Sequence, residues 1–142
     1  MPSFTLCYKQ YDYEVTLAAS KEFKQETGKC LIDFICLACS AYVDAKNTTG
    51  LLKDRTVSMM QVVPSDDCAF ALYCLGKTKN RALTFEEVWD ATMKTQFVES
   101  GDGKNEPVQI VAAQVGINFI NQRQELDSPK DSAERQDDTE TA

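Results

Sequence analysis

The chain has 142 residues, a net charge of −7 and no histidine. This length is sufficient for one domain whose core needs no disulfide or metal ion to fold. The acidic charge disfavours binding to nucleic acid or to an anionic membrane surface, because both attract Lys and Arg. The lack of histidine excludes a Ser-His or Cys-His nucleophile within the chain and removes the commonest metal ligand.

The N-terminal segment alternates between apolar and polar residues. The alternation runs over 4–8 and again over 13–17, and a short polar stretch at 10–12 separates the two runs. This period of two predicts a β-hairpin over 4–17 with its turn at 10–12. A hairpin alone is marginally stable in water, so we expect it to pack on helices or to pair with an edge strand of another chain.

Two helices are predicted in the next part of the chain. Ser20 is a suitable N-cap for a short helix that continues to Glu26, and Gly28 is a suitable residue to end it. The segment 29–46 is apolar on nearly every side at helical spacing, which is typical of a central buried helix. Its apolar run is shorter than the ~18 residues that a membrane span needs.

Further helices are expected in the second half of the chain. Their boundaries are given by a proline stop, by N-cap residues and by a capping box. The predicted helices are 51–63 before Pro64, Ser65 to about Leu75, a helix opening at Thr84 with Glu87, and a last helix with Pro107 at its first position. The sequence thus predicts a mainly α protein with a short N-terminal β-hairpin (α+β), a small helical domain of about five helices.

The composition changes at residue 122. Residues 122–142 contain three cations, seven anions and one large apolar residue, Leu126. Such a segment buries too little apolar surface to offset the entropy of ordering. We therefore expect a hairpin-plus-helical domain over 1–121 and a disordered acidic tail over 122–142.

The six cysteines are the sharpest chemical candidates. The N-terminus lacks the charged and apolar regions of a signal peptide, so we expect a reducing cytoplasm, free thiols and a coincidental glycosylation sequon at 47–49. Cys36 and Cys39 have CxxC spacing, but they fall within a predicted helix on an apolar face. A thioredoxin-type pair needs a helix N-terminus, and a zinc site needs two more ligands. We therefore expect these cysteines to pack in the core.

Other charged clusters have structural explanations. Asp66-Asp67 and Glu86-Glu87 fall in predicted first turns, where the helix dipole favours anions. The cluster Lys77, Lys79 and Arg81 suits a helix C-terminus, although it could also bind an acidic partner. The segment 101–104 lacks the further glycine of a phosphate-binding loop. We therefore expect no catalytic, cofactor-binding or metal-binding residue, and no cofactor.

The order of these features resembles a known family. Residues 13–17 (YEVTL), residues 21–29 (KEFKQETGK) with the long apolar helix after them, and residues 83–91 (LTFEEVWDA) are similar to the tail assembly chaperones of lambdoid long-tailed bacteriophages. The likeness covers about 4–121, judged by the order of elements. The cysteine-rich helix is not a feature of that family.

The resemblance implies a factor that binds the tape-measure protein, keeps it soluble and helps recruit tail-tube subunits. It also implies a location in the host bacterial cytoplasm, absence from the mature virion and a longer frameshifted form, for which the codons of 128–130 could provide the slippery sequence. Exposed hairpin edges and an apolar helix further suggest a homo-oligomer. The alternatives are a structural tail or connector protein of the virion and a small thiol oxidoreductase that uses Cys36 and Cys39.

Overall fold

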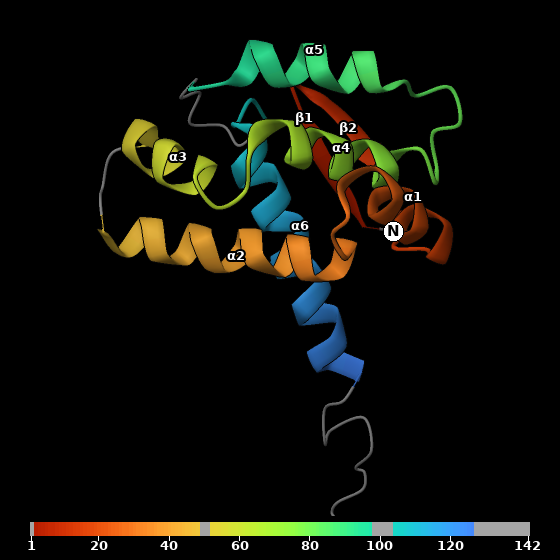
Figure 1. Ribbon diagram of the computed structural model, residues 1–142, viewed down its shortest axis with the longest axis horizontal. Helices are drawn as coiled ribbons and strands as arrows, with labels where there is room; N and C mark the ends of the chain where they lie inside the picture. The colour runs from red at the N-terminus through yellow and green to blue at the C-terminus, as the bar shows by residue number, and fades with distance from the viewer. Residues whose placement is uncertain (1, 49–51, 98–103, 127–142) are drawn as a thin grey trace, which may run out of the picture.

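A computed structural model describes residues 2–48, 52–97 and 104–126. These residues form a two-stranded antiparallel hairpin followed by six helices, which confirms the predicted α+β class (Figure 1). The elements are β1 (Ser3–Leu6), β2 (Lys9–Asp12), α1 (Leu17–Thr27), α2 (Leu31–Thr48), α3 (Leu52–Met60), α4 (Ser65–Gly76), α5 (Phe85–Thr95) and α6 (Val108–Leu126).

The hairpin is shorter than predicted and turns at a different place. Phe4 pairs with Tyr11, and Leu6 pairs with Lys9, so the turn lies at Cys7 and Tyr8 rather than at 10–12. Both turn residues have positive φ, 51° and 68°, as a two-residue type I′ turn requires. Neither is the Gly, Asn or Asp that usually marks such a turn, which explains why the sequence pattern misplaced it.

The chain after the hairpin enters a helix where a strand was expected. Thr16 is the N-cap of α1, and its hydroxyl accepts a hydrogen bond from the Ala19 backbone N–H at 3.1 Å. The prediction of Ser20 as the N-cap is therefore wrong by one helical turn. The predicted end is confirmed, because Gly28 has φ 76° and its N–H donates to the Lys24 carbonyl at 2.8 Å.

The most buried helix is α4 rather than α2. The fully buried residues of α4 lie on several sides of it, since it contacts α1, α5 and α6; they are Cys68, Ala69, Ala71, Leu72, Cys74, Leu75 and Gly76. Helix α2 instead buries one face and leaves Leu37 and Val43 about half exposed, at 45% and 47%. The predicted central helix is thus a one-sided outer helix.

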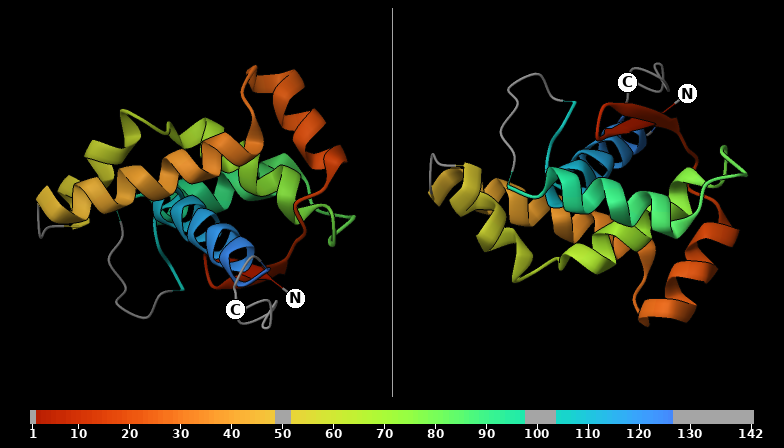
Figure 2. Two further views of the ribbon diagram at one scale, coloured as in Figure 1. Left: turned by 90° about the horizontal axis from the view of Figure 1, so that it is seen from below. Right: turned by 90° about the horizontal axis from the view of Figure 1, so that it is seen from above.

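Helices α2 and α6 cross at close range, and the hairpin lies beside α6 (Figure 2). Gly116 marks the crossing point: a Cβ built there would lie 2.1 Å from the Ile35 carbonyl oxygen. Beyond this point Phe119 still packs against the core, and the last part of α6 projects past α2 (Figure 1). It continues to Leu126, so the first residues of the predicted tail, 122–126, are helical. Residues 127–142 lie outside the described part of the chain.

A partly buried polar network joins α4, the end of α5 and α6. The Gln109 amide nitrogen donates to the Ser65 hydroxyl at 2.7 Å, and the Gln96 amide nitrogen donates to the Gln109 side-chain oxygen at 3.2 Å. The Ser65 hydroxyl in turn donates to the Gln96 oxygen at 3.3 Å. Ser65 therefore links three helices through hydrogen bonds. It is not the N-cap of α4, because Pro64 occupies that position.

Candidate functional site

An open groove with an aromatic floor and an acidic rim lies between α1, α4 and the start of α5. It has a volume of about 920 Å³, at the upper end of the range for ligand sites. We call it the aromatic groove; its lining residues are Glu22, Gln25, Glu26, Thr27, Asp66, Asp67, Phe70, Tyr73, Leu83, Thr84, Phe85 and Glu86.

Residues at the starts of α4 and α5 form much of the rim of the groove. Thr84 is the N-cap of α5, and its hydroxyl accepts from the Glu87 N–H at 3.2 Å, which confirms the predicted cap. Asp66, Asp67, Glu86 and Glu87 lie in first turns, as predicted. Glu87 turns away and pairs with Lys9 at 3.3 Å, whereas the other three join Glu22 and Glu26 of α1 around the groove.

The floor of the groove belongs to a continuous row of aromatic rings. Phe70 has ring-centroid distances of 6.2 Å to Phe23, 5.7 Å to Tyr73 and 5.7 Å to Phe85. Phe23 is fully buried, but Phe70, Tyr73 and Phe85 are only partly buried and pack on the core. Three rings therefore border the groove and keep part of their surface exposed to a partner.

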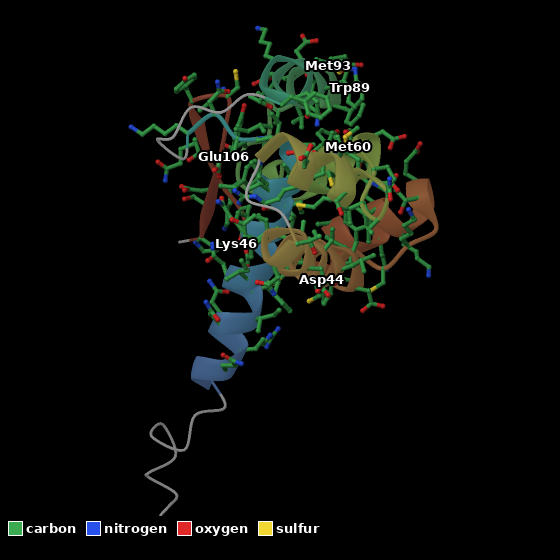
Figure 3. The ribbon with its side chains drawn as sticks, turned by 90° about the vertical axis from the view of Figure 1, so that its left-hand side faces the viewer. Asp44, Lys46, Met60, Trp89, Met93 and Glu106 are labelled. Carbon is green, nitrogen blue, oxygen red and sulfur yellow. The ribbon has the colours of Figure 1, made fainter. Side chains whose placement is uncertain are left out.

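The aromatic row continues along α5. Phe85 stacks on Trp89 at 6.2 Å, and Met93 follows four residues later with 57% of its surface exposed. Spacing of four places these residues on one helix face, which we call the α5 stripe. Met93, Trp89 and Met60 follow one another from α5 toward α3 (Figure 3). The groove and the stripe share Phe85 and therefore form one continuous surface, in which aromatic rings and Met93 lie beside acidic side chains.

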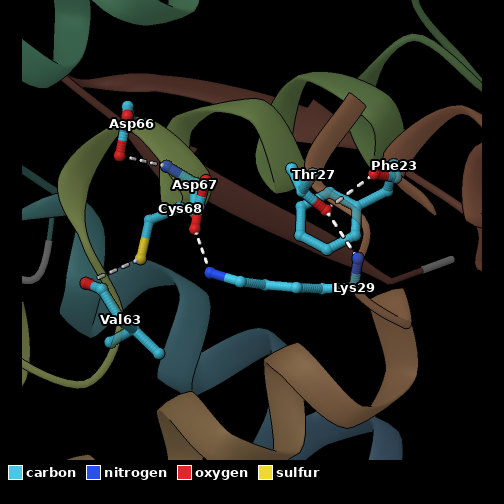
Figure 4. A network of polar contacts seen from close by, with 7 residues as sticks. All are labelled: Phe23, Thr27, Lys29, Val63, Asp66, Asp67 and Cys68. Carbon is cyan, nitrogen blue, oxygen red and sulfur yellow. Dashed lines mark hydrogen bonds and ion pairs between the residues drawn. The ribbon is translucent and has the colours of Figure 1, made fainter. Parts of the chain in front are cut away.

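One end of the groove is held by a polar network (Figure 4). Lys29 forms an ion pair with Asp67 and lies over the ring of Phe34, 5.7 Å from its centroid. The Lys29 backbone N–H donates to the Thr27 hydroxyl at 3.1 Å. The Asp67 N–H donates to the Asp66 carboxylate at 2.9 Å. These contacts fix the α1–α2 junction against the start of α4.

A second lysine holds the other end of the groove. Lys77 pairs with Glu22 at 3.0 Å and lies 5.0 Å over the centroid of the Tyr73 ring. The hydrogen bonds to Glu22 and then to the Tyr73 hydroxyl raise the pKa of the Lys77 ammonium. Lys79 pairs with Glu14 at 3.3 Å, so the two lysines of the predicted cationic cluster connect the C-terminal end of α4 to α1 and the residues before it.

The cysteines occupy more varied places than expected. Cys68 and Cys74 are fully buried, Cys30 is exposed, and Cys7, Cys36 and Cys39 are half-buried; all six are free thiols. The expected core packing is therefore confirmed for Cys68 and Cys74 and wrong for Cys30, whereas Cys36 and Cys39 are buried only in part. Burial raises the pKa of the Cys36 thiol, with smaller contributions from Cys39, Asp33 and Cys30. A raised pKa disfavours the thiolate that a redox mechanism uses.

Among the residues that the structure describes, no three His, Cys, Asp or Glu side chains are arranged to hold a metal ion. No helix in the described ranges is long and apolar enough to cross a membrane.

The sequence marks Asp66, Asp67 and Glu86 separately, each as part of a helix start. It has no local signal for the role of Glu22 and Glu26 of α1 or of the three rings that these acids surround. The aromatic residues Phe70, Tyr73 and Phe85 were visible in the sequence, but no local pattern shows that α1, α4 and α5 converge.

Comparison with known proteins found no match: no protein-family model, no curated protein and no solved structure is similar to this chain.

Proposed function

We propose that this protein is a tail assembly chaperone of a long-tailed bacteriophage, which binds the tape-measure protein and keeps it soluble. The proposal begins from the resemblance in residues 13–29 and 83–91. The observation that carries it is the continuous surface of aromatic and acidic side chains formed by the aromatic groove and the α5 stripe. A tape-measure protein is a long and mostly helical chain, and helices with an apolar face bind in grooves of this kind.

The chemistry of the surface suits reversible binding. Fully burying one large apolar side chain is worth about 1.5–3 kcal/mol, and ordering and association offset much of the gain. The available anchors are few and already partly buried: Phe70, Tyr73, Phe85 and Trp89, with Met93 as the most exposed. Each site therefore binds its client weakly, and many copies along a long client keep it covered until the tube subunits replace them.

The remaining parts of the proposal concern location and partners. The chaperone works in the host cytoplasm, helps recruit tail-tube protein, associates with copies of itself and is absent from the mature virion. A net charge of −7 supports this role, because like charges keep the chaperone–client complex soluble.

Co-expression with the tape-measure gene of the same genome tests the proposal. The tape-measure protein should be soluble with the wild-type chain and insoluble without it. Met93→Ser should reduce the soluble fraction, because it removes the most exposed anchor of the α5 stripe. Leu37→Ser is the matched control, since Leu37 is 45% exposed on α2 and does not line the groove.

Two results would overturn the proposal. One is a tape-measure protein whose solubility is the same with and without the chain. The other is recovery of the chain in stoichiometric amounts from purified particles, which would favour a structural tail or connector protein instead.

A further inference from the structure

The two lysines at the ends of the aromatic groove share one arrangement. Lys77 combines a carboxylate, Glu22, with a ring face, Tyr73. Lys29 combines the carboxylate of Asp67 with the ring of Phe34. In each case the ammonium group gains both an ion pair and a cation–π contact. One lysine of the chain thus borders the groove at each end, paired with a lining carboxylate.

The middle of the groove also combines carboxylates with aromatic rings, but the described residues place no cation there. Phe70 and Phe85 present their rings there, and Glu26, Asp66 and Glu86 stand at the rim. Among the described residues, no lysine or arginine lines the groove or forms an ion pair with these three carboxylates. The resident pairs at the ends neutralise Glu22 and Asp67, so the negative potential is concentrated in the middle.

We propose that the middle of the aromatic groove recognises Lys or Arg side chains on the apolar-faced helical segment of a partner. The cationic groups lie over Phe70 and Phe85 and pair with Glu26 and Glu86, while the apolar face of the same helix lies on the α5 stripe. The identity of that partner as the tape-measure protein rests on the proposed function; the recognition chemistry does not.

The chain's own C-terminal segment is a poor occupant. Residues 127–142 contain six acidic and two basic residues, so this segment carries the same sign of charge as the rim. Like charges in close contact are repelled rather than bound. Charge complementarity therefore points to a separate, basic partner.

Peptide binding provides the test, and the protein contains its own probe. Trp89 is the single tryptophan of the chain, and it stacks on Phe85, which lines the groove. The ligand is a tryptophan-free amphipathic helical peptide with leucine on one face and arginine beside it. A second peptide replaces each arginine by citrulline, which keeps the shape and removes the charge. The emission of Trp89 is followed during titration of the full-length protein with each peptide.

We expect the arginine peptide to bind at least about fivefold more tightly than the citrulline peptide, since two exposed cationic contacts together supply about that factor. The Glu26→Gln/Glu86→Gln variant should lose this preference. Asp12→Asn/Asp44→Asn is the matched control, because it removes the same charge from two exposed residues outside the groove and should retain the preference.

A third variant isolates the ring contribution. Phe85→Leu keeps an apolar side chain at the groove but removes the aromatic face. It should weaken binding of the arginine peptide by about threefold relative to the citrulline peptide.

The outcomes separate this inference from the proposed function. Equal binding of the two peptides, or no binding of either, overturns cation recognition and leaves the co-expression result to stand by itself. An equal loss in the control variant overturns it too, because net charge rather than the groove would then set affinity. The arginine peptide could be preferred in a way that depends on Glu26 and Glu86 while the co-expression result is negative. That outcome would support cation recognition by the groove and reject the tape-measure protein as its partner.

Discussion

Replacing Gly116 by alanine tests the close crossing of α2 and α6. An added Cβ would lie 2.1 Å from the Ile35 carbonyl oxygen, 2.8 Å from its carbonyl carbon and 3.3 Å from the Cβ of Cys39. Ordinary contacts between such atoms are about 3.5 Å or longer, so the helices must separate by at least about 1 Å. The nearest atoms belong to the backbone, and no change of rotamer can relieve the clash.

The expected cost follows from two opposing effects. Overpacking a well-packed interface costs about 1–3 kcal/mol, and a backbone clash belongs at the upper end of that range. Alanine is favoured over glycine inside a helix by about 1 kcal/mol. We therefore expect Gly116→Ala to lower the free energy of unfolding by about 2 kcal/mol, which corresponds to a fall in Tm of about 6 °C for a domain of this size.

Urea and thermal unfolding, followed by far-UV circular dichroism, measure this change. Gly76→Ala is the matched control: its added Cβ would meet the Leu83 Cδ2 atom at 2.8 Å, and the flexible end of that side chain can move. It should therefore destabilise the protein less. Asn121→Ala, at an exposed position of α6, should be neutral or slightly stabilising. A Gly116→Ala protein as stable as the wild type would refute the close crossing.

Four further predictions concern the polar network, the hairpin turn and, in two cases, the thiols. Gln109→Leu should lower the free energy of unfolding by about 1–3 kcal/mol, because it leaves the hydrogen-bonding partners of Gln109 unsatisfied. The double variant with Ser65→Ala should lose less than the sum of the two single losses. Additive losses in urea unfolding would contradict a coupled network. Tyr8→Gly should stabilise the protein by about 1 kcal/mol, because Tyr8 is 60% exposed and has φ 68°; a lower Tm would show that the ring contributes more than the turn. A thiol reagent at pH 8 should modify Cys30 in the native protein and reach Cys68 and Cys74 only after unfolding, a result checked by peptide mapping. Burial raises the pKa of the Cys74 thiol from 9.0 to about 12. The thiol therefore loses its proton at lower pH in the unfolded chain than in the folded one, and the free energy of unfolding should fall as pH rises from 9 toward 12. A free energy of unfolding that stays constant over this window would contradict the burial of the thiol.

Short-range signals in the sequence were sufficient for the ends of several helices. Gly28 ends α1 with positive φ, and Thr84 caps α5 through the Glu87 N–H, both as predicted. These interactions span three or four residues, so the local sequence contains both partners. The mainly helical class followed in the same way from spacing and capping.

Positions that depend on distant partners were predicted poorly. The segment 29–46 is apolar on nearly every side, yet α2 lies at the outside, because burial depends on which helices surround a segment and not on its own composition. The turn at Cys7 and Tyr8 has no glycine to mark it, and the Tyr8 N–H donates to the Lys104 carbonyl at 2.8 Å, nearly a hundred residues away in the chain. Such a contact exists only after folding.

In the candidate site, too, the local features were predictable from the sequence and the contacts between distant segments were not. The sequence by itself determined the acidic charge, the helical class and the acidic first turns of α4 and α5. Only the tertiary structure decided that these turns meet Glu22 and Glu26 of α1 over the rings of Phe70 and Phe85. The physical reason is that a groove is a relation among three packed elements, whereas propensity and periodicity report on one element at a time.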